Sequence, residues 1–228
     1  MGFGEELLAG ADEPVRRFFT HAIRQGAPLP SRVRLSMAGR VRAGRWLPFV
    51  AEQQCDARSF SWRARVGWGR VTPLHVHDRY ERGAGSVELR LFGRLRLSRS
   101  ADLDTTRSAA GRAALEAVVF APATVPPGGG VRWRADGDNR LVARFDLPPE
   151  RPEVHVQIDR AGAMRAAHAQ RWGDPAKRGF GYVPCGCEVH AERRFGDLVV
   201  PSRVTVGWWF GTPRYAPFFE AEITELSL

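Results

Sequence analysis

The sequence has very little lysine and no concentrated block of positive charge. Lys177 is its only lysine, although Lys and Arg together number 34 against 25 Asp and Glu, and the formal net charge is +9. This preference for arginine, with abundant alanine and glycine, is typical of a GC-rich genome. Nucleic-acid binders gather positive charge on one helix or patch, with stacking aromatic residues in between. Here arginine occurs in almost every segment, so we expect no nucleic-acid partner.

Cysteine is also scarce, and long apolar runs are absent. Cys55, Cys185 and Cys187 cannot form a disulfide framework, and cysteines two positions apart are seldom bridged because the geometry is strained. The thiols are therefore expected to be reduced. No apolar run reaches about 18 residues, and no secretory signal pattern is present. We expect a soluble, cytoplasmic protein with no membrane span.

Sequence motifs for common cofactors are missing as well. The glycines at 128–130 lack the Lys-Ser and the helix pattern of a phosphate-binding loop, and no Gly-x-Ser-x-Gly nucleophile elbow occurs. The sequence therefore favours neither nucleotide-dependent chemistry nor serine hydrolysis. We predict that the protein needs no cofactor.

The hydrophobic pattern changes its period along the chain. Asp12 as N-cap and apolar residues at helical spacing predict an amphipathic helix over 12–25. Alanines at intervals of three and four predict a second helix over 104–120. Period-two alternation predicts strands throughout 31–97 and 131–226. With 43% hydrophobic and 26% charged residues and no linker, the 228 residues are expected to form a single domain.

These elements define the predicted fold class. About ten to twelve sequential strands with short turns, against two helices, indicate a mainly β (α+β) protein built on a large curved antiparallel sheet or half-barrel. Residues 87–97 are expected to form one of these strands, and Pro48 marks an edge strand or a bulge. The central Ala-rich helix is expected to cover the concave face and to leave an apolar hollow beneath it. Two sheets packed face to face are the alternative.

The segment Gly207–Tyr215 is the most distinctive in the chain. Its sequence, Gly-Trp-Trp-Phe-Gly-Thr-Pro-Arg-Tyr, follows a strand pattern and ends with turn residues. Three consecutive large rings bury too much apolar area to stay in water, so they either pack in the core or line a pocket. Arg214 and Tyr215, immediately beside the rings, are the polar groups that a small-molecule site also needs.

Four ordered motifs resemble the signature segments of an uncharacterised bacterial family. They are Arg-Trp-Leu-Pro-Phe at 45–49, Arg-Ser-Ala-Ala-Gly-Arg at 107–112, Arg-Trp-Gly-Asp-Pro at 171–175 and Gly-Trp-Trp-Phe-Gly-Thr at 207–212. The resemblance covers the chain from about residue 13 onward and implies no activity. The expected layout also resembles the half-barrels that carry lipoproteins or lipids in bacterial envelopes, which is a similarity of fold alone. Cys185 departs from the family pattern, which has an aromatic residue after Tyr-x-Pro.

Asp78 is the strongest candidate for an acid or base. It falls in register with the inward apolar residues of its strand, where a carboxylate is either ion-paired or has a perturbed pKa. On the Ala-rich helix, Arg112 and Glu116 share a face and form either a solvated pair or part of the hollow. Arg107 or Arg112 is the expected electrostatic partner of Asp78, and Tyr215 is the expected hydrogen-bond donor.

The remaining candidate residues are those expected to line the hollow. They are Trp46, Trp62, Tyr80, Trp172, Cys185, Trp208, Trp209 and Arg214. His75, His77, Cys185 and Cys187 are residue types that zinc could in principle use. The histidines alternate with the inward apolar residues and so are expected to face outward, and the cysteines lack the usual two-residue spacer. We predict no metal site.

These observations favour a protein that holds an apolar small molecule and performs cofactor-free acid–base chemistry on it, such as a cyclisation or isomerisation. A binding or carrier protein for a lipid or hydrophobic metabolite, which leaves its ligand unchanged, is the main alternative. A module whose arginine-rich face meets an acidic surface is the third.

Overall fold

The computed structural model describes residues 2–68 and 71–228, which form 13 strands, two α-helices and two short 3-10 helices. The helical elements are η1 (Glu5–Leu8), α1 (Glu13–Ala22), α2 (Leu103–Phe120) and η2 (Pro122–Thr124). The first six strands are β1 (Val33–Ala43), β2 (Arg45–Cys55), β3 (Phe60–Trp68), β4 (Val71–Glu81), β5 (Ala84–Leu91) and β6 (Leu95–Ser100). The others are β7 (Arg132–Ala135), β8 (Arg140–Arg144), β9 (Glu153–Ile158), β10 (Met164–Gly173), β11 (Gly181–Phe195), β12 (Leu198–Trp208) and β13 (Ala216–Ser227).

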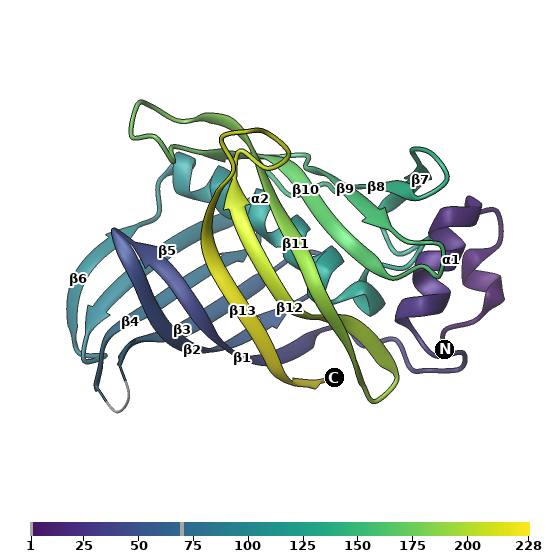
Figure 1. The fold of residues 1–228 in the computed structure, drawn as a ribbon, viewed down its shortest axis with the longest axis horizontal. Helices are drawn as coiled ribbons and strands as arrows, with labels where there is room; N and C mark the ends of the chain where they lie inside the picture. The colour runs from purple at the N-terminus through teal and green to yellow at the C-terminus, as the bar shows by residue number, and fades with distance from the viewer. Residues whose placement is uncertain (1, 69–70) are drawn as a thin grey trace.

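All the strands belong to one antiparallel sheet with the order β6-β5-β4-β3-β2-β1-β13-β12-β11-β10-β9-β8-β7. Two meanders, β1 to β6 and β7 to β13, meet at the β1/β13 pair, which is the seam of the sheet. The sheet curves around α2, and β6 and β7 form its two ends (Figure 1). The predicted curved antiparallel sheet is confirmed, and the face-to-face sandwich is wrong because one hydrogen-bonded ladder joins every strand.

Alternation along each strand decides which side chains face the concave side of the sheet. In β3, Phe60, Trp62 and Ala64 are buried, whereas Arg63 and Arg65 face away from the core. A period of two places successive side chains on opposite faces, so the apolar set of each strand turns toward α2. Arg63 and Arg65 lie on the outer face for the same reason.

The helix α2 is buried because its residues are small. Ala109, Ala110 and Ala113 are at most 3% exposed, and a Cβ on Gly85 of β5 would lie 2.7 Å from the Cα of Thr106. The helix therefore approaches the sheet closely. Its N-cap is Asp102, whose side chain accepts a hydrogen bond from the Thr105 amide at 2.7 Å, and it begins one residue before the predicted position.

The helix α1 closes one end of the molecule. Phe18 and Phe19 pack against the ring of Trp133, with centroids 5.7 and 5.1 Å away. The helix is shorter than the predicted 12–25, because Ile23 leaves helical geometry to form a bridge with Leu198. Asp12 occupies the N-cap position, but its carboxylate accepts a hydrogen bond from the Ala135 amide at 2.6 Å instead of capping α1.

Two details of the predicted strands change. Residues 87–97 form parts of β5 and β6 instead of one strand, because Phe92 and Gly93 both have positive φ and turn the chain. Leu95 and Leu97 are consequently exposed. Pro48 lies inside β2, just outside the stretch that is paired with β3, since that pairing begins at Phe49. The strand is locally an edge there, where a missing N–H costs no ladder bond.

The aromatic rings of segment 207–215 pack on three glycines, which belong to β10, β11 and β12. A Cβ on Gly173 would lie 2.6 Å from the Trp208 ring, one on Gly186 would lie 2.3 Å from the Phe210 ring, and one on Gly207 would lie 2.3 Å from the Tyr215 ring. These glycines leave room for the rings to lie against the backbone. The rings in turn cover strand positions that have no side chain of their own.

This packing predicts a strong coupling between Gly186 and Phe210. The substitution Gly186→Ala should lower the free energy of unfolding by about 1–3 kcal/mol, because its methyl group overlaps the ring. Phe210→Ala alone should also destabilise the fold, but Gly186→Ala should cost less in that background. A double-mutant cycle in urea should give a coupling of at least about 1 kcal/mol. Strict additivity of the two changes would contradict the ring-on-glycine contact.

Candidate functional site

A cavity of about 260 Å³ lies between α2 and the concave face of the sheet. It is lined by Val41, Gln53, Trp62, Asp78, Arg112, Leu115, Glu116, Val119, Phe120, Arg171, Cys185, Gly186, Cys187, Val206, Trp208, Phe218 and Phe219. These residues come from α2 and from strands on both sides of the β1/β13 seam. Most of the lining is apolar, and three of its charged groups, Asp78, Arg112 and Glu116, form one wall.

The charged wall is organised around Arg112. Its Nη1 donates to Asp78 Oδ2 at 2.6 Å, and its Nε donates to Glu116 Oε1 at 2.7 Å. The other Glu116 oxygen accepts a hydrogen bond from Gln53 Nε2 at 3.0 Å. The guanidinium also lies 4.8 Å from the centre of the Phe60 ring and 5.1 Å from that of Trp62. One cation thus holds two carboxylates against aromatic faces.

Burial shapes the protonation of this wall. Burial alone would lower the pKa of Arg112, but the charges of Glu116 and Asp78 more than offset it and raise that pKa. Burial raises the pKa of Glu116, and the Arg112 charge opposes this rise. Burial also raises the pKa values of Cys185 and Cys187, so both thiols are neutral at physiological pH. Cys55, Cys185 and Cys187 are all free and buried.

Aromatic rings form the wall opposite α2. Trp208 stacks on Phe218 with centroids 5.8 Å apart, and Arg171 lies 5.1 Å from the centre of the Trp208 ring. Arg171 is held by α2, since its Nε donates to the Ser108 carbonyl oxygen at 3.0 Å and its Nη2 to the Ser108 hydroxyl at 3.2 Å. This contact ties α2 to β10 beside the cavity.

Six of the residues selected from the sequence line this cavity: Trp62, Asp78, Arg112, Glu116, Cys185 and Trp208. Asp78 points inward, as its register predicts. Arg112, not Arg107, is its ion-pair partner, because the two arginines lie five positions apart on α2 and leave it on different sides. The solvated-pair alternative for Arg112 and Glu116 is wrong, since their side chains are only 18% and 11% exposed.

Arg107 and Trp172 instead line a separate hollow of about 370 Å³. There Arg107 Nε donates to Glu150 at 2.5 Å, and its guanidinium lies 3.4 Å from the centre of the Trp172 ring. Tyr182 completes the group, accepting a hydrogen bond from Arg107 at 3.0 Å and donating one to Glu150 at 2.7 Å. The Arg107 charge is thereby paired outside the main cavity.

The two candidate tyrosines also lie away from the cavity lining. Tyr80 is 1% exposed, and its hydroxyl donates to the Pro148 carbonyl oxygen at 2.6 Å, while burial raises its pKa to about 12. Tyr215 packs its ring on Gly207, and burial raises its pKa as well. Tyr80 therefore belongs to the core, whereas the half-buried Tyr215 packs on the backbone of β12.

The remaining predicted wall residues form cation–π pairs elsewhere. Arg40 lies over the Trp46 ring at 5.3 Å, at the far end of β2. Arg214 lies over the Trp209 ring at 4.6 Å, and Trp209 itself has positive φ in the turn after β12. Because the backbone changes direction at Trp209, its side chain does not follow the strand alternation. Trp208 does follow it and lines the cavity.

Several cavity residues were missed by the sequence reasoning. Gln53 falls on the buried face of β2, between Ala51 and Cys55, and a lone amide in an apolar period-two set is a signal that could have indicated it. Phe218 and Phe219 gave no such signal. They reach the cavity because β13 pairs with β1, a contact between strands at opposite ends of the chain.

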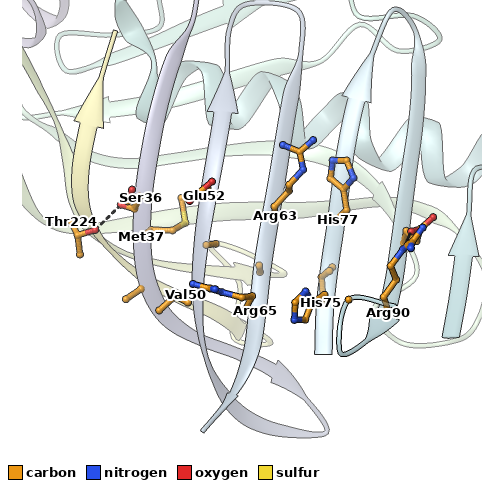
Figure 2. A pocket seen from close by; sticks show the side chains of 16 residues that line it. Ser36, Met37, Val50, Glu52, Arg63, Arg65, His75, His77, Arg90 and Thr224 are labelled. Carbon is orange, nitrogen blue, oxygen red and sulfur yellow. Dashed lines mark hydrogen bonds and ion pairs between the residues drawn. The ribbon is translucent and has the colours of Figure 1, made fainter. Parts of the chain in front are cut away.

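The outer face carries a larger and more open groove, of about 790 Å³, over β1 to β5 (Figure 2). Arg63, Arg65, His75 and His77 project from β3 and β4 in Figure 2, on the face away from the cavity, which confirms the predicted outward orientation of the histidines. His77 contacts the Ser61 hydroxyl at 3.0 Å. Since the groove is shallow and lined by charged groups, it has the character of a solvated sheet face.

Two further observations concern metal ligands and membrane-spanning helices among the described residues. Within residues 2–68 and 71–228, no group of three or more His, Cys, Asp or Glu side chains is arranged to hold a metal ion. His75 and His77 lie on the outer face, whereas Cys185 and Cys187 line the inner cavity. In the same part of the chain, none of the helices has the length and apolar character required to cross a bilayer.

The chain belongs to a family of unknown function, DUF6920, whose model matches residues 12–227. The predicted membership of an uncharacterised family is thus confirmed. No functionally curated protein is significantly similar to the chain in sequence.

Solved structures with a similar arrangement include a DUF1329 family protein from Desulfovibrio piger, with 11% identity, 96% and 92% of the two chains covered and a TM-score of 0.49. A LolA superfamily protein from Nitrosomonas europaea has 6% identity, 96% and 93% coverage and a TM-score of 0.47. One fold hosts many activities, so these likenesses define neither a ligand nor a reaction.

Proposed function

We propose that this protein binds an apolar small molecule, or the apolar part of a lipid, in the cavity between α2 and the sheet, and leaves it chemically unchanged. The cavity itself carries the proposal. Protein interiors are packed to crystal-like density, with few voids larger than a water molecule. A space of about 260 Å³ bordered by Leu115, Val119 and Val206 is much larger than such a void. Apolar cavities of about 150 Å³ already accommodate a benzene-sized ligand.

The contacts favour binding over the acid–base chemistry predicted from the sequence. Arg112 engages one oxygen of Asp78 and one of Glu116, so both carboxylates take part in a structural ion-pair network. The cavity thiols have raised pKa values and are not activated nucleophiles. Tyr215 does not line the cavity. The predicted acid or base Asp78, its partner Arg112 and the predicted donor Tyr215 therefore do not converge on one point.

A fluorescent apolar probe tests the proposal. N-phenyl-1-naphthylamine should bind the wild type saturably with one site per chain. Leu115→Trp should weaken that binding at least about tenfold, because the larger indole occupies the space and overpacking costs about 1–3 kcal/mol. Leu115 is 8% exposed and lines the cavity, whereas Leu103 on the same helix is 65% exposed, so Leu103→Trp is the matched control.

The measurement is a fluorescence titration, with circular dichroism to verify that each variant is folded. Equal affinities for the Leu115→Trp and Leu103→Trp variants would place the probe elsewhere and contradict the proposal. Absence of saturable binding to the wild type would contradict it as well.

A further inference from the structure

Two buried polar atoms of cavity-lining residues have no hydrogen-bond partner among the described residues. They are Trp62 Nε1 and Asp78 Oδ1, and both are shielded from solvent. Trp62 and Asp78 are directly opposed in the register of β3 and β4, and both line the cavity. Side chains opposed across an antiparallel pair have Cβ atoms about 4.5–5.5 Å apart. One donor and one acceptor therefore belong to neighbouring side chains of the same wall.

Leaving such groups unsatisfied is costly. An unpaired buried donor or acceptor costs about 1–3 kcal/mol, and most buried polar atoms in native proteins are paired. Neither group is free to turn away. Asp78 is held by Arg112 through its other oxygen, and the Trp62 ring is packed edge-on against Phe49 with centroids 5.6 Å apart. Both residues border the cavity, and each atom needs a partner that the described side chains do not supply.

The chemistry of the two atoms selects the polar end of a ligand. The indole N–H can only donate, and an ionised carboxylate can only accept. A hydroxyl group satisfies both, because it accepts from Trp62 and donates to Asp78. A carboxylate ligand has no donor for Asp78, and an ammonium has no acceptor for Trp62. The cavity lining has two carboxylates, Asp78 and Glu116, and two guanidiniums, Arg112 and Arg171, so its charges balance without a ligand ion.

We propose that the ligand is a neutral apolar alcohol whose hydroxyl bridges Trp62 Nε1 and Asp78 Oδ1, with its hydrocarbon part against Leu115, Val119 and Trp208. This inference rests on the proposed function and assigns its ligand class. The test compares 1-octanol with its isomer heptyl methyl ether, each displacing N-phenyl-1-naphthylamine. The ether keeps the acceptor and loses the donor, so wild type should bind the alcohol about fivefold more tightly.

Two variants separate the two hydrogen bonds. Trp62→Phe keeps an aromatic ring and removes the N–H, so it should weaken alcohol and ether alike by about fivefold and keep their ratio. In the Asp78→Asn variant, Arg112 holds the amide oxygen because it needs an acceptor, and the amide NH2 then faces the cavity. The preference for the alcohol should disappear or reverse in favour of the ether.

The outcomes distinguish an incorrect ligand class from an incorrect proposed function. Failure of the fluorescent probe to bind would overturn the proposed function itself. The wild type could instead bind the probe but show equal affinities for alcohol and ether. That result would leave the cavity proposal intact and overturn the assignment of an alcohol ligand, and it is expected if water bridges the two atoms. An unchanged alcohol affinity in the Trp62→Phe variant would also overturn it, even if the Asp78→Asn variant did not fold.

Discussion

Replacing Arg112 by methionine should lower the free energy of unfolding by about 3–5 kcal/mol at pH 8, the usual cost of removing one partner from a buried ion pair. Arg112 lies between Asp78 and Glu116, whose side chains are only 13% and 11% exposed. Without the guanidinium, two carboxylates remain close together on a buried wall, and methionine replaces only its apolar stem. Urea unfolding followed by circular dichroism measures the loss.

A surface pair provides the control for this substitution. Arg40 pairs with Glu220 on the outer side of the β1/β13 seam, and its side chain is 56% exposed. Exposed ion pairs contribute about 0–1 kcal/mol, so Arg40→Met should cost less than about 1 kcal/mol. Equal losses for the two variants would show that the Arg112 network is no more important to stability than a solvated pair.

The loss of unfolding free energy caused by Arg112→Met should also depend on pH. Burial raises the pKa of Glu116 and Arg112 opposes this, so removing Arg112 raises it further. Above the ordinary glutamate pKa of about 4.3, the folded variant then retains a proton that the unfolded chain releases. Because the native state binds more protons in this window, its stability falls as the pH rises. The difference in unfolding free energy between wild type and variant should therefore grow from pH 5 to pH 8. A constant difference would contradict the burial of these carboxylates.

The second large effect is expected at the seam of the sheet. A Cβ on Gly39 of β1 would lie 1.9 Å from the backbone oxygen of Glu220 and 2.9 Å from the Cα of Ala221 in β13. Backbone atoms in a paired strand cannot move aside as a side chain can. Gly39→Ala should therefore lower the free energy of unfolding by about 3 kcal/mol or more, at the upper end of overpacking costs.

The matched control for the seam is Gly181, which begins β11. Nothing lies within 4 Å of a Cβ placed there, and its φ is not positive. Gly181→Ala should leave stability within about 1 kcal/mol of the wild type, as is usual for surface substitutions. If thermal and urea unfolding of Gly39→Ala matched this control, β1 and β13 would not be joined as closely as the structure has them.

The strands and helices could be predicted well from local pattern, because burial against one core gives each element its own period. The inward orientation of Asp78 and the shared face of Arg112 and Glu116 followed from such periods. The exception is the β5/β6 hairpin. Leucines alternate on both sides of it, and only the positive φ at Phe92 and Gly93 shows that the chain turns there.

Where each aromatic ring packs depends on the residues that lie next to it in space. Trp208, Phe210 and Tyr215 lie in one short segment, and each packs over a glycine, of β10, β11 and β12 respectively. Trp172 and Trp208 both lie at the end of a strand but border different hollows, since Trp172 faces Arg107 and Trp208 faces Arg171. Which residue stands opposite a ring is decided by strand register, and no segment contains that information about its partner.

The amino-acid sequence by itself therefore determined the class of the fold, the two helices and the faces of most strands, since these depend on interactions between residues close together in the chain. The tertiary structure decided that β1 pairs with β13, and thereby that Gln53, Phe218 and Phe219 meet Arg112 around one cavity. It also decided that Arg112 and not Arg107 pairs with Asp78. These contacts join residues far apart in the chain, and they exist only once the curved sheet has wrapped around α2.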